Sequence, residues 1–162
     1  MKTLILFYSF GGNTKKIAKM IHKEIPSDMC EVETVKPYEG EYDTVVEYAK
    51  KEVESGGKPD IKKLSVNPSD YDVIFLGSPV WWYTFAPAIN TVLNSFDLKG
   101  KTIYPFITNG GWLGTTIKDI KNKCKDSVVK DGINIVFDEE KLRTKEVEIN
   151  NWINKIKKEL NL

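Results

Sequence analysis

Cysteine, arginine and histidine are scarce in this 162-residue sequence, which holds two, one and one of them. Cys30 and Cys124 lie in no metal-binding or redox spacing, so we expect buried or idle thiols in a reducing cytoplasm. Because Arg143 is the only arginine, a bidentate arginine clamp on a phosphate is scarcely available. His22 falls on the polar side of a predicted helix, where we expect it to be exposed and without a catalytic role.

The sequence also lacks long apolar runs and carries almost no net charge. No run approaches the ~20 residues that span a bilayer, and we expect no signal peptide, because a predicted strand starts close to the first residue. The net charge is only +1, which gives no general attraction to nucleic acid or to an acidic membrane. The length suits one domain with a substantial core, residues 1–162. We find no catalytic dyad or triad and expect no metal site.

The stretch Ile5–Ile21 organises the chain. The apolar run from Thr3 to Tyr8 predicts a strand buried on both faces, as in a parallel sheet. A polar turn with two glycines follows, residues 9–14. Apolar residues then recur on one face of a predicted helix, opposite a face of lysines. The pattern of this segment therefore predicts a strand, a tight turn and a helix.

This turn is suited to holding an anion. The first NH groups of a helix have no partner within it and carry partial positive charge. Gly11 and Gly12 let the backbone approach a phosphate, and Ser9, Asn13 and Thr14 add short polar side chains. The alternative is an ordinary helix cap at Asn13 or Thr14. The nucleotide-triphosphatase and dinucleotide glycine motifs are absent, as are a cysteine nucleophile and an acidic residue at the strand end.

The rest of the chain alternates between strand and helix patterns. This order predicts an α/β protein with one doubly wound, five-stranded parallel sheet and helices on both faces. Pro105 is an objection to a central position for its strand, unless its missing NH falls at a bulge. The connection 58–69 is expected to be irregular. Further strands are expected at 30–35, 72–76 (ended by 77–79), 102–108 and 132–137, and helices at 42–53, 87–96, 115–124 and 145–160.

Three loops follow the carboxyl ends of strands, where ligands bind in such sheets: residues 9–14, 78–85 and 108–114. In the second, Trp81, Trp82 and Tyr83 could stack on a flat ring, or pack under the next helix instead. In the third, a glycine-rich backbone could hydrogen-bond the polar edge of that ring. Trp112 is a candidate lid or a surface cover for the following helix. Together the loops suit one flat, phosphorylated cofactor.

The residues Ile5-Leu6-Phe7, Ser9, Gly12, Thr14, Ala18 and Ile21 resemble the phosphate-loop signature of the flavodoxin family. Residues 77–82 and 108–111 resemble the second and third flavin loops of short-chain flavodoxin-like proteins, so the likeness spans essentially the whole chain. The resemblance implies bound FMN and the strand order 2-1-3-4-5. It also implies these cofactor-binding positions: Ser9, Phe10, Gly11, Gly12, Asn13, Thr14, Pro79, Val80, Trp81, Trp82, Tyr83, Thr108, Asn109, Gly110, Gly111 and Trp112.

Two departures from the family pattern bear on redox properties. Typical flavodoxins are strongly acidic, whereas this chain is near neutral and its three loops contain no Asp or Glu. We therefore expect the reduction potential for forming the fully reduced flavin to be less negative than in those acidic proteins. Residues 80–84 also lack the glycine at which many flavodoxins flip a peptide toward the reduced ring, which puts strong stabilisation of the one-electron-reduced flavin in doubt.

Three functions remain open at this point. The first is an FMN-dependent electron carrier that docks transiently with redox partner proteins, a reductase and an acceptor. The second is an enzyme on the same fold, an NAD(P)H-dependent quinone or FMN reductase, for which neutral charge is a mild argument. The third is a cofactor-free binding module, which would ignore added FMN.

Overall fold

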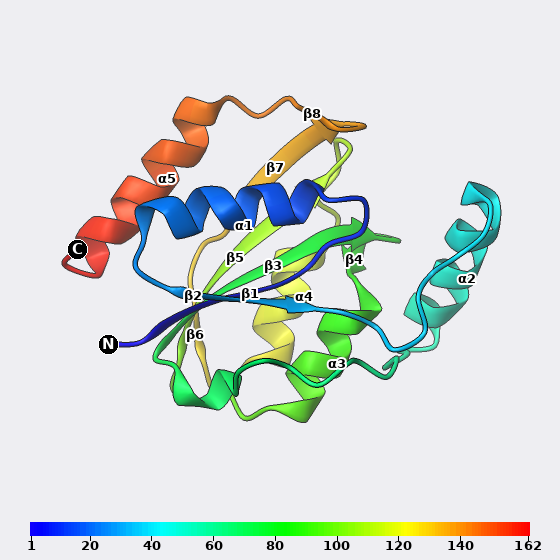
Figure 1. The fold of residues 1–162 in the computed structure, drawn as a ribbon, viewed down its shortest axis with the longest axis horizontal. Helices are drawn as coiled ribbons and strands as arrows, with labels where there is room; N and C mark the ends of the chain where they lie inside the picture. The colour runs from blue at the N-terminus through cyan, green and yellow to red at the C-terminus, as the bar shows by residue number, and fades with distance from the viewer.

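Five long parallel strands form the centre of one sheet in the order β2-β1-β3-β5-β7, which confirms the predicted order 2-1-3-4-5. The computed structural model describes all residues 1–162 (Figure 1). Three two-residue strands pair with β3, β5 and β7 and raise the total to eight. The long strands are β1 (Thr3–Tyr8), β2 (Asp28–Val32), β3 (Val73–Trp81), β5 (Thr102–Asn109) and β7 (Ile133–Asp138); the short ones are β4 (Thr84–Phe85), β6 (Val128–Val129) and β8 (Lys141–Leu142).

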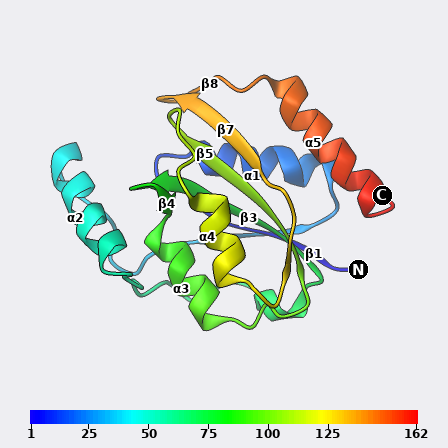
Figure 2. The same ribbon diagram turned by 180° about the vertical axis from the view of Figure 1, so that it is seen from behind.

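Four helices cover the two faces of the sheet, as Figures 1 and 2 show. Helices α1 (Asn13–Glu24) and α5 (Glu146–Glu159) lie on one face, and α3 (Pro87–Ser95) and α4 (Thr116–Lys123) on the other. Strand β1 is buried along its whole length because alternate side chains enter two different cores. Leu4 and Leu6 pack toward α3 and α4, whereas Ile5 and Phe7 pack toward α1 and α5.

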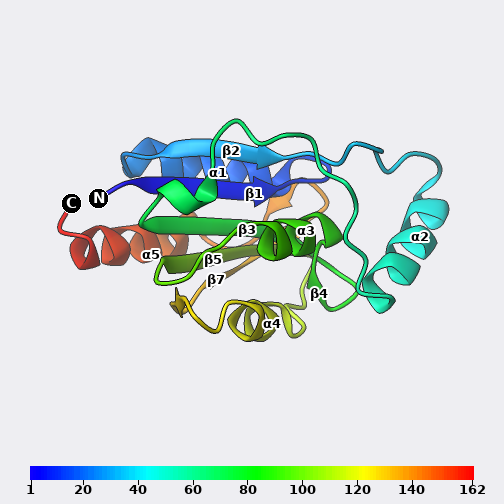
Figure 3. The same ribbon diagram turned by 90° about the horizontal axis from the view of Figure 1, so that it is seen from below.

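Helix α2 (Tyr42–Glu54) departs from this two-layer pattern. It stands beyond the carboxyl ends of the strands instead of covering the sheet (Figure 3), and Ala49 is its only buried residue. The irregular segment after it, which includes the one-turn helix Pro68–Asp70, runs back beside β2. There Ile61, Leu64 and Val66 pack on the core and cover the sheet in place of a helix.

Backbone hydrogen bonds join the two ends of the segment 35–60, which contains α2. Thr34 and Ile61 form an isolated antiparallel bridge. Beside it, Val35 N donates to Asp60 O at 2.9 Å and Lys62 N donates to Glu33 O at 2.8 Å. Residues 35–60 therefore leave and rejoin the sheet region at neighbouring points.

Strand β3 is longer than its apolar run predicted. The expectation that residues 77–79 end the strand is wrong, because β3 continues to Trp81 and keeps pairing with β5 as far as Pro79 opposite Thr108. Pairing with β1 ends at Gly77, so Pro79 lies where β3 has lost one neighbour and a missing NH is tolerated. The chain then turns back through β4, so residues 78–85 form a hairpin.

Pro105 lies in the middle of the sheet, and the interruption of its neighbour explains why. Strand β6 ends at Val129, and β7 begins only at Ile133. Lys130 N donates to Ile103 O on this side of β5, so the missing NH of Pro105 faces the gap. A Cβ on Gly132 would lie 2.5 Å from Pro105 O, which shows how closely the irregular backbone passes. The gap between β6 and β7 therefore takes the place of the bulge that we expected beside a central Pro105.

Both cysteines are buried and unpaired, and His22 is exposed, in agreement with the sequence. None of the helices is both long and apolar enough to cross a membrane.

Three buried tyrosines should make the folded protein less stable at alkaline pH. Burial raises the pKa of Tyr8 and Tyr104 above the usual range, and a hydrogen bond to Asp28 raises that of Tyr71 to about 12. An unfolded tyrosine loses its proton near pH ~10 whereas these keep theirs, so the free energy of unfolding should fall as pH rises above that value. Ultraviolet absorbance of tyrosinate, recorded with circular dichroism, should show these tyrosines ionising only as the fold is lost. Their ionisation near pH ~10 in the folded protein would contradict this.

Candidate functional site

The loop between β1 and α1 has the backbone of an anion cradle. Gly11 and Gly12 have φ of +82° and +99°, a left-handed region that favours glycine. A Cβ on either would meet no atom within 4 Å, so the space over the loop is open to a ligand. The NH groups of Gly12, Asn13 and Thr14 make no hydrogen bond within the chain. Three donors at the positive end of a helix dipole suit a phosphate.

The polar side chains of this loop connect it to neighbouring segments. Ser9 Oγ accepts from Lys15 N at 3.2 Å, and Asn13 Nδ2 donates to Glu139 O, in the β7–β8 turn, at 2.7 Å. The buried hydroxyl of Thr14 is 2.8 Å from that of Thr108 at the end of β5. The backbone NH groups are thus the donors that the loop leaves free, and the first loop is fixed against the third.

The hairpin between β3 and β4 turns on two bulky residues. Trp82 and Tyr83 have φ of 47° and 73°, and positive φ at both central residues is the signature of a type I′ turn. That turn normally uses Asn-Gly or Gly-Gly, and a non-glycine residue in this region costs about 1–3 kcal/mol. Such strain is often found at ligand-binding segments.

Helix α4 and the third loop hold this turn in place. Tyr83 O accepts from Thr115 N at 2.8 Å, and Asp119 Oδ2 accepts from the hydroxyls of Thr84 and Thr115 at 2.6 and 2.7 Å. Gly114 has φ +61°, and a Cβ there would lie 2.3 Å from Tyr83 O. Only glycine allows the third loop to pack this closely on the turn.

The third loop, after β5, presents backbone and one aromatic ring. Asn109 Oδ1 accepts from Gly111 N at 2.9 Å, which folds the loop back on itself. Gly110 and Gly111 are exposed, and the ring of Trp112 is 66% exposed with its centre 4.7 Å from that of Tyr83. Trp112 therefore packs against the ring of Tyr83 in the hairpin turn.

The second and third loops flank an open hollow of about 410 Å³. All seven residues that line it belong to the predicted cofactor-binding set: Val80, Trp82, Tyr83, Asn109, Gly110, Gly111 and Trp112. Pro79 and Thr108 pair at the strand ends directly below. With the glycines of the first loop, these residues give an anion cradle, an aromatic wall and a glycine-rich polar edge at one end of the sheet.

Trp81 lies elsewhere than in that hollow. Its ring is edge-on to those of Tyr8, Phe10 and Tyr38, with centres 4.9–5.7 Å apart. Trp82 reaches α2, where Nε1 donates to Val46 O at 3.0 Å and the Lys50 ammonium lies 5.1 Å from the ring centre. The assignment of Trp81 to the ring wall remains a prediction. Tyr38 was given no role from the sequence, although it follows the carboxyl end of a strand and the same positional rule applies to it.

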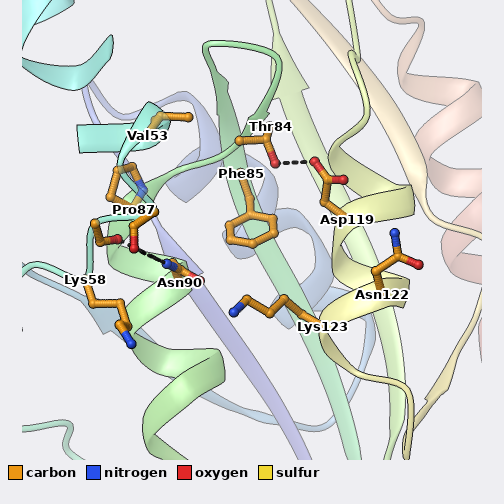
Figure 4. Close-up of a pocket in the computed structure, with 11 residues that line it drawn as sticks. Val53, Lys58, Thr84, Phe85, Pro87, Asn90, Asp119, Asn122 and Lys123 are labelled. Atoms are coloured by element: carbon orange, nitrogen blue, oxygen red, sulfur yellow. Dashed lines mark hydrogen bonds between the residues drawn. The ribbon is translucent and has the colours of Figure 1, made fainter. Parts of the chain in front are cut away.

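A second hollow of about 410 Å³ lies away from these loops, between the end of α2, α3 and α4 (Figure 4). Its lining is mostly polar, with Thr84 bonded to Asp119 and the Asn90 amide donating to the carbonyls of Gly56 and Gly57 at 3.2 and 3.1 Å. It contains neither the glycines of the first loop nor residues 109–112. We therefore assign no cofactor to it.

Comparisons with known proteins agree with this geometry. The sequence profile of the flavodoxin family matches residues 2–156. A flavoprotein from Lactobacillus acidophilus NCFM, solved in complex with FMN, is 26% identical, covers 93% of this chain and 97% of its own, and has a TM-score of 0.74. A protein described as a flavoprotein from Bacteroides eggerthii is 28% identical over 96% of this chain and 97% of its own, with a TM-score of 0.78.

A flavodoxin from the domain Archaea covers 100% of both chains at 18% identity and a TM-score of 0.56, which shows the fold alone. A comparison with curated proteins finds no match. A profile match over nearly the whole length, on a sheet of the expected order, is decisive for kinship. The chain therefore belongs to the flavodoxin family.

Proposed function

We propose that this chain is an FMN-binding electron-transfer protein. The observation that carries the proposal is the convergence of three loops at one end of the sheet, two of them joined by the Thr14–Thr108 hydrogen bond. The relative from Lactobacillus acidophilus that was crystallised with FMN supports the choice of cofactor. A cytoplasmic location belongs to the proposal, because Cys30 and Cys124 are free thiols.

The residues present fit FMN. The free NH groups of Gly12, Asn13 and Thr14 would hold the phosphate without a buried cation. Trp82 and Tyr83 would lie against the ring, and the backbone of Gly110 and Gly111 would meet its polar edge. When bound, FMN supplies reversible one- and two-electron chemistry, so the chain itself needs to bind, orient and shield the ring.

The rim of the site suits a transient redox partner. Tyr83 and Trp112 are 52% and 66% exposed, which leaves aromatic edges at the surface beside the proposed ring position. A reductase or acceptor protein that docks here would form a small interface and release quickly. An enzyme that reduces a small molecule is the second candidate, favoured by the apolar hollow described below.

A visible spectrum taken anaerobically with FMN, before and after NADH or NADPH is added, tests the proposal. We expect a bound-flavin spectrum that stays oxidised until a separate reductase is supplied. Rapid bleaching by the nicotinamide alone would indicate a reductase in its own right. A colourless protein that ignores FMN would contradict the proposed function.

Asp119 should support FMN binding without touching it. Asp119→Ala removes the acceptor of two hydroxyl groups that hold the hairpin turn, each worth about 1 kcal/mol. We expect FMN affinity to fall roughly five- to tenfold, measured by fluorescence titration. Asn122→Ala, one turn further along α4 and in the same polar hollow, is the matched control (Figure 4). Equal affinities for the two variants would show that the turn needs no such anchor.

A further inference from the structure

An apolar hollow of about 550 Å³ lies between α2 and the ends of β1 and β3. Nine of its ten lining residues are hydrophobic, among them Phe10, Tyr38, Val45, Val46 and Trp81. Its volume and apolar lining are those of a small-molecule site. It is separate from the hollow between the second and third loops, although the two share Val80 and Trp82.

The wall of this hollow is held by side chains from distant parts of the chain. Trp81 is edge-on to Phe10 and Tyr38, with interplanar angles of 85° and 81°. Tyr38 donates a hydrogen bond to Glu52 on α2, and burial together with this bond raises its pKa, so the phenol keeps its proton. Tyr38 and Trp81 are thus held in place before a ligand binds, so their side chains have little entropy left to lose on binding.

The roof of the hollow is α2. It is tied down by the bond from Trp82 Nε1 to Val46 O and by the burial of Ala49. Val45 and Val46 remain half-buried, because the space below them is not filled by side chains of this chain. An apolar helix face is therefore held over an apolar wall with room for a flat molecule between them.

Three carboxylates stand beside the hollow against one nearby ammonium, that of Lys50, which lies 5.1 Å from the ring centre of Trp82, so the charge around the hollow is negative on balance. Glu39, Glu41 and Asp43 are exposed and flank Gly40 and Tyr42, which line it. Carboxylates repel a negatively charged ligand, so a nicotinamide dinucleotide with its pyrophosphate is disfavoured. Neutral aromatic molecules meet no such barrier.

We propose that this hollow binds a neutral bicyclic aromatic molecule of the quinone class, which accepts electrons from the flavin. The inference deepens the proposed function and its redox part rests on it. The hollow adjoins the assigned ring position across the Val80–Trp82 segment. Bound FMN that a reductase protein has fully reduced would supply the two electrons and two protons that convert the two C=O groups of the quinone to C–OH.

Calorimetric titration of the full chain with menadione, with and without saturating FMN, tests the site. We expect similar affinity in both states, and binding of an anionic naphthoquinone sulfonate at least severalfold more weakly. Val45→Trp fills the hollow and should weaken menadione binding at least tenfold while FMN affinity is unchanged. Glu47→Trp, which puts the same side chain on the exposed face of α2, should bind menadione like the wild type. If Val45→Trp fails to fold, Val45→Glu, which introduces a carboxylate, takes its place.

Three results would overturn the inference. Displacement of menadione by FMN would mean that the hollow belongs to the flavin. Unchanged binding by both Val45 variants would place the ligand elsewhere, and equal binding of the sulfonate would remove the selection for neutral molecules. If FMN fails to bind at all, the proposed function fails, whereas the Val45 and Glu47 variants still decide whether menadione occupies this hollow.

Discussion

Replacing Gly12 with valine is expected to weaken FMN binding at least a hundredfold, about 2.8 kcal/mol. Gly12 has φ +99°, where a β-branched residue is strained by about 1–3 kcal/mol. Its new side chain would project into the open space over the loop, where we place the phosphate. Relaxation of the strain would also turn away the free NH groups of the helix start. Quenching of FMN fluorescence on titration measures the affinity.

Gly100→Val is the matched control for this experiment. Gly100 also has a positive φ, +78°, and also has no neighbour within 4 Å of a built Cβ. It lies in the turn before β5, at the amino ends of the strands and away from the three loops. Both variants should lose similar stability, and only Gly12→Val should lose FMN. Equal loss of affinity in the two would mean that backbone strain acts through the whole fold, and unchanged affinity in Gly12→Val would contradict the phosphate assignment.

Gly77→Ala is expected to destabilise the protein strongly, by about 3 kcal/mol. Gly77 lies in the central strand β3, opposite Phe106 on β5. A Cβ there would lie 2.3 Å from Cζ and 2.4 Å from Cε2 of Phe106, whose ring is fully buried and cannot move aside. Urea unfolding followed by circular dichroism gives the free energy of unfolding.

A double variant tests whether this one contact is responsible. Leucine in place of Phe106 lacks the ring atoms that would clash, so Gly77→Ala combined with Phe106→Leu should be more stable than Gly77→Ala alone. Phe106→Leu on its own should destabilise the protein, because it leaves space beside Gly77. The expected result is therefore strong non-additivity. Additive losses would show that Gly77 is required for a reason other than Phe106.

Hydrophobic periodicity predicted the regular elements well, because each core position repeats a local pattern. The run from Thr3 to Tyr8 indicated a strand buried on both faces, and β1 is one. The apolar spacing over 42–53 predicted α2 almost to the residue. The order of the strands came from resemblance to a family, since periodicity does not say which strands are neighbours. The rule that ligands bind beyond the carboxyl ends of strands located the three loops.

What the sequence did not reveal depends on contacts between distant residues. The position of α2 beyond the sheet follows from Ile61, Leu64 and Val66 occupying the place of a covering helix. No turn rule predicts a type I′ turn at Trp82-Tyr83, because anchors on another helix hold it there. The surroundings of Trp81 come from three separate segments of the chain.

The closed base of residues 35–60 makes this segment an exchangeable module. The Thr34–Ile61 bridge holds its two ends together, so a shorter or longer segment between them should leave the structure of the sheet almost unchanged. Doubling the length of a flexible insert costs only about 0.6 kcal/mol of closure entropy. The roof over the apolar hollow can therefore diverge between relatives, or be replaced by grafting, while the phosphate loop and the core stay as they are. In this architecture the choice of small molecule can change while the phosphate loop stays the same, provided that a new roof still accepts the hydrogen bond that Trp82 Nε1 now donates to Val46 O.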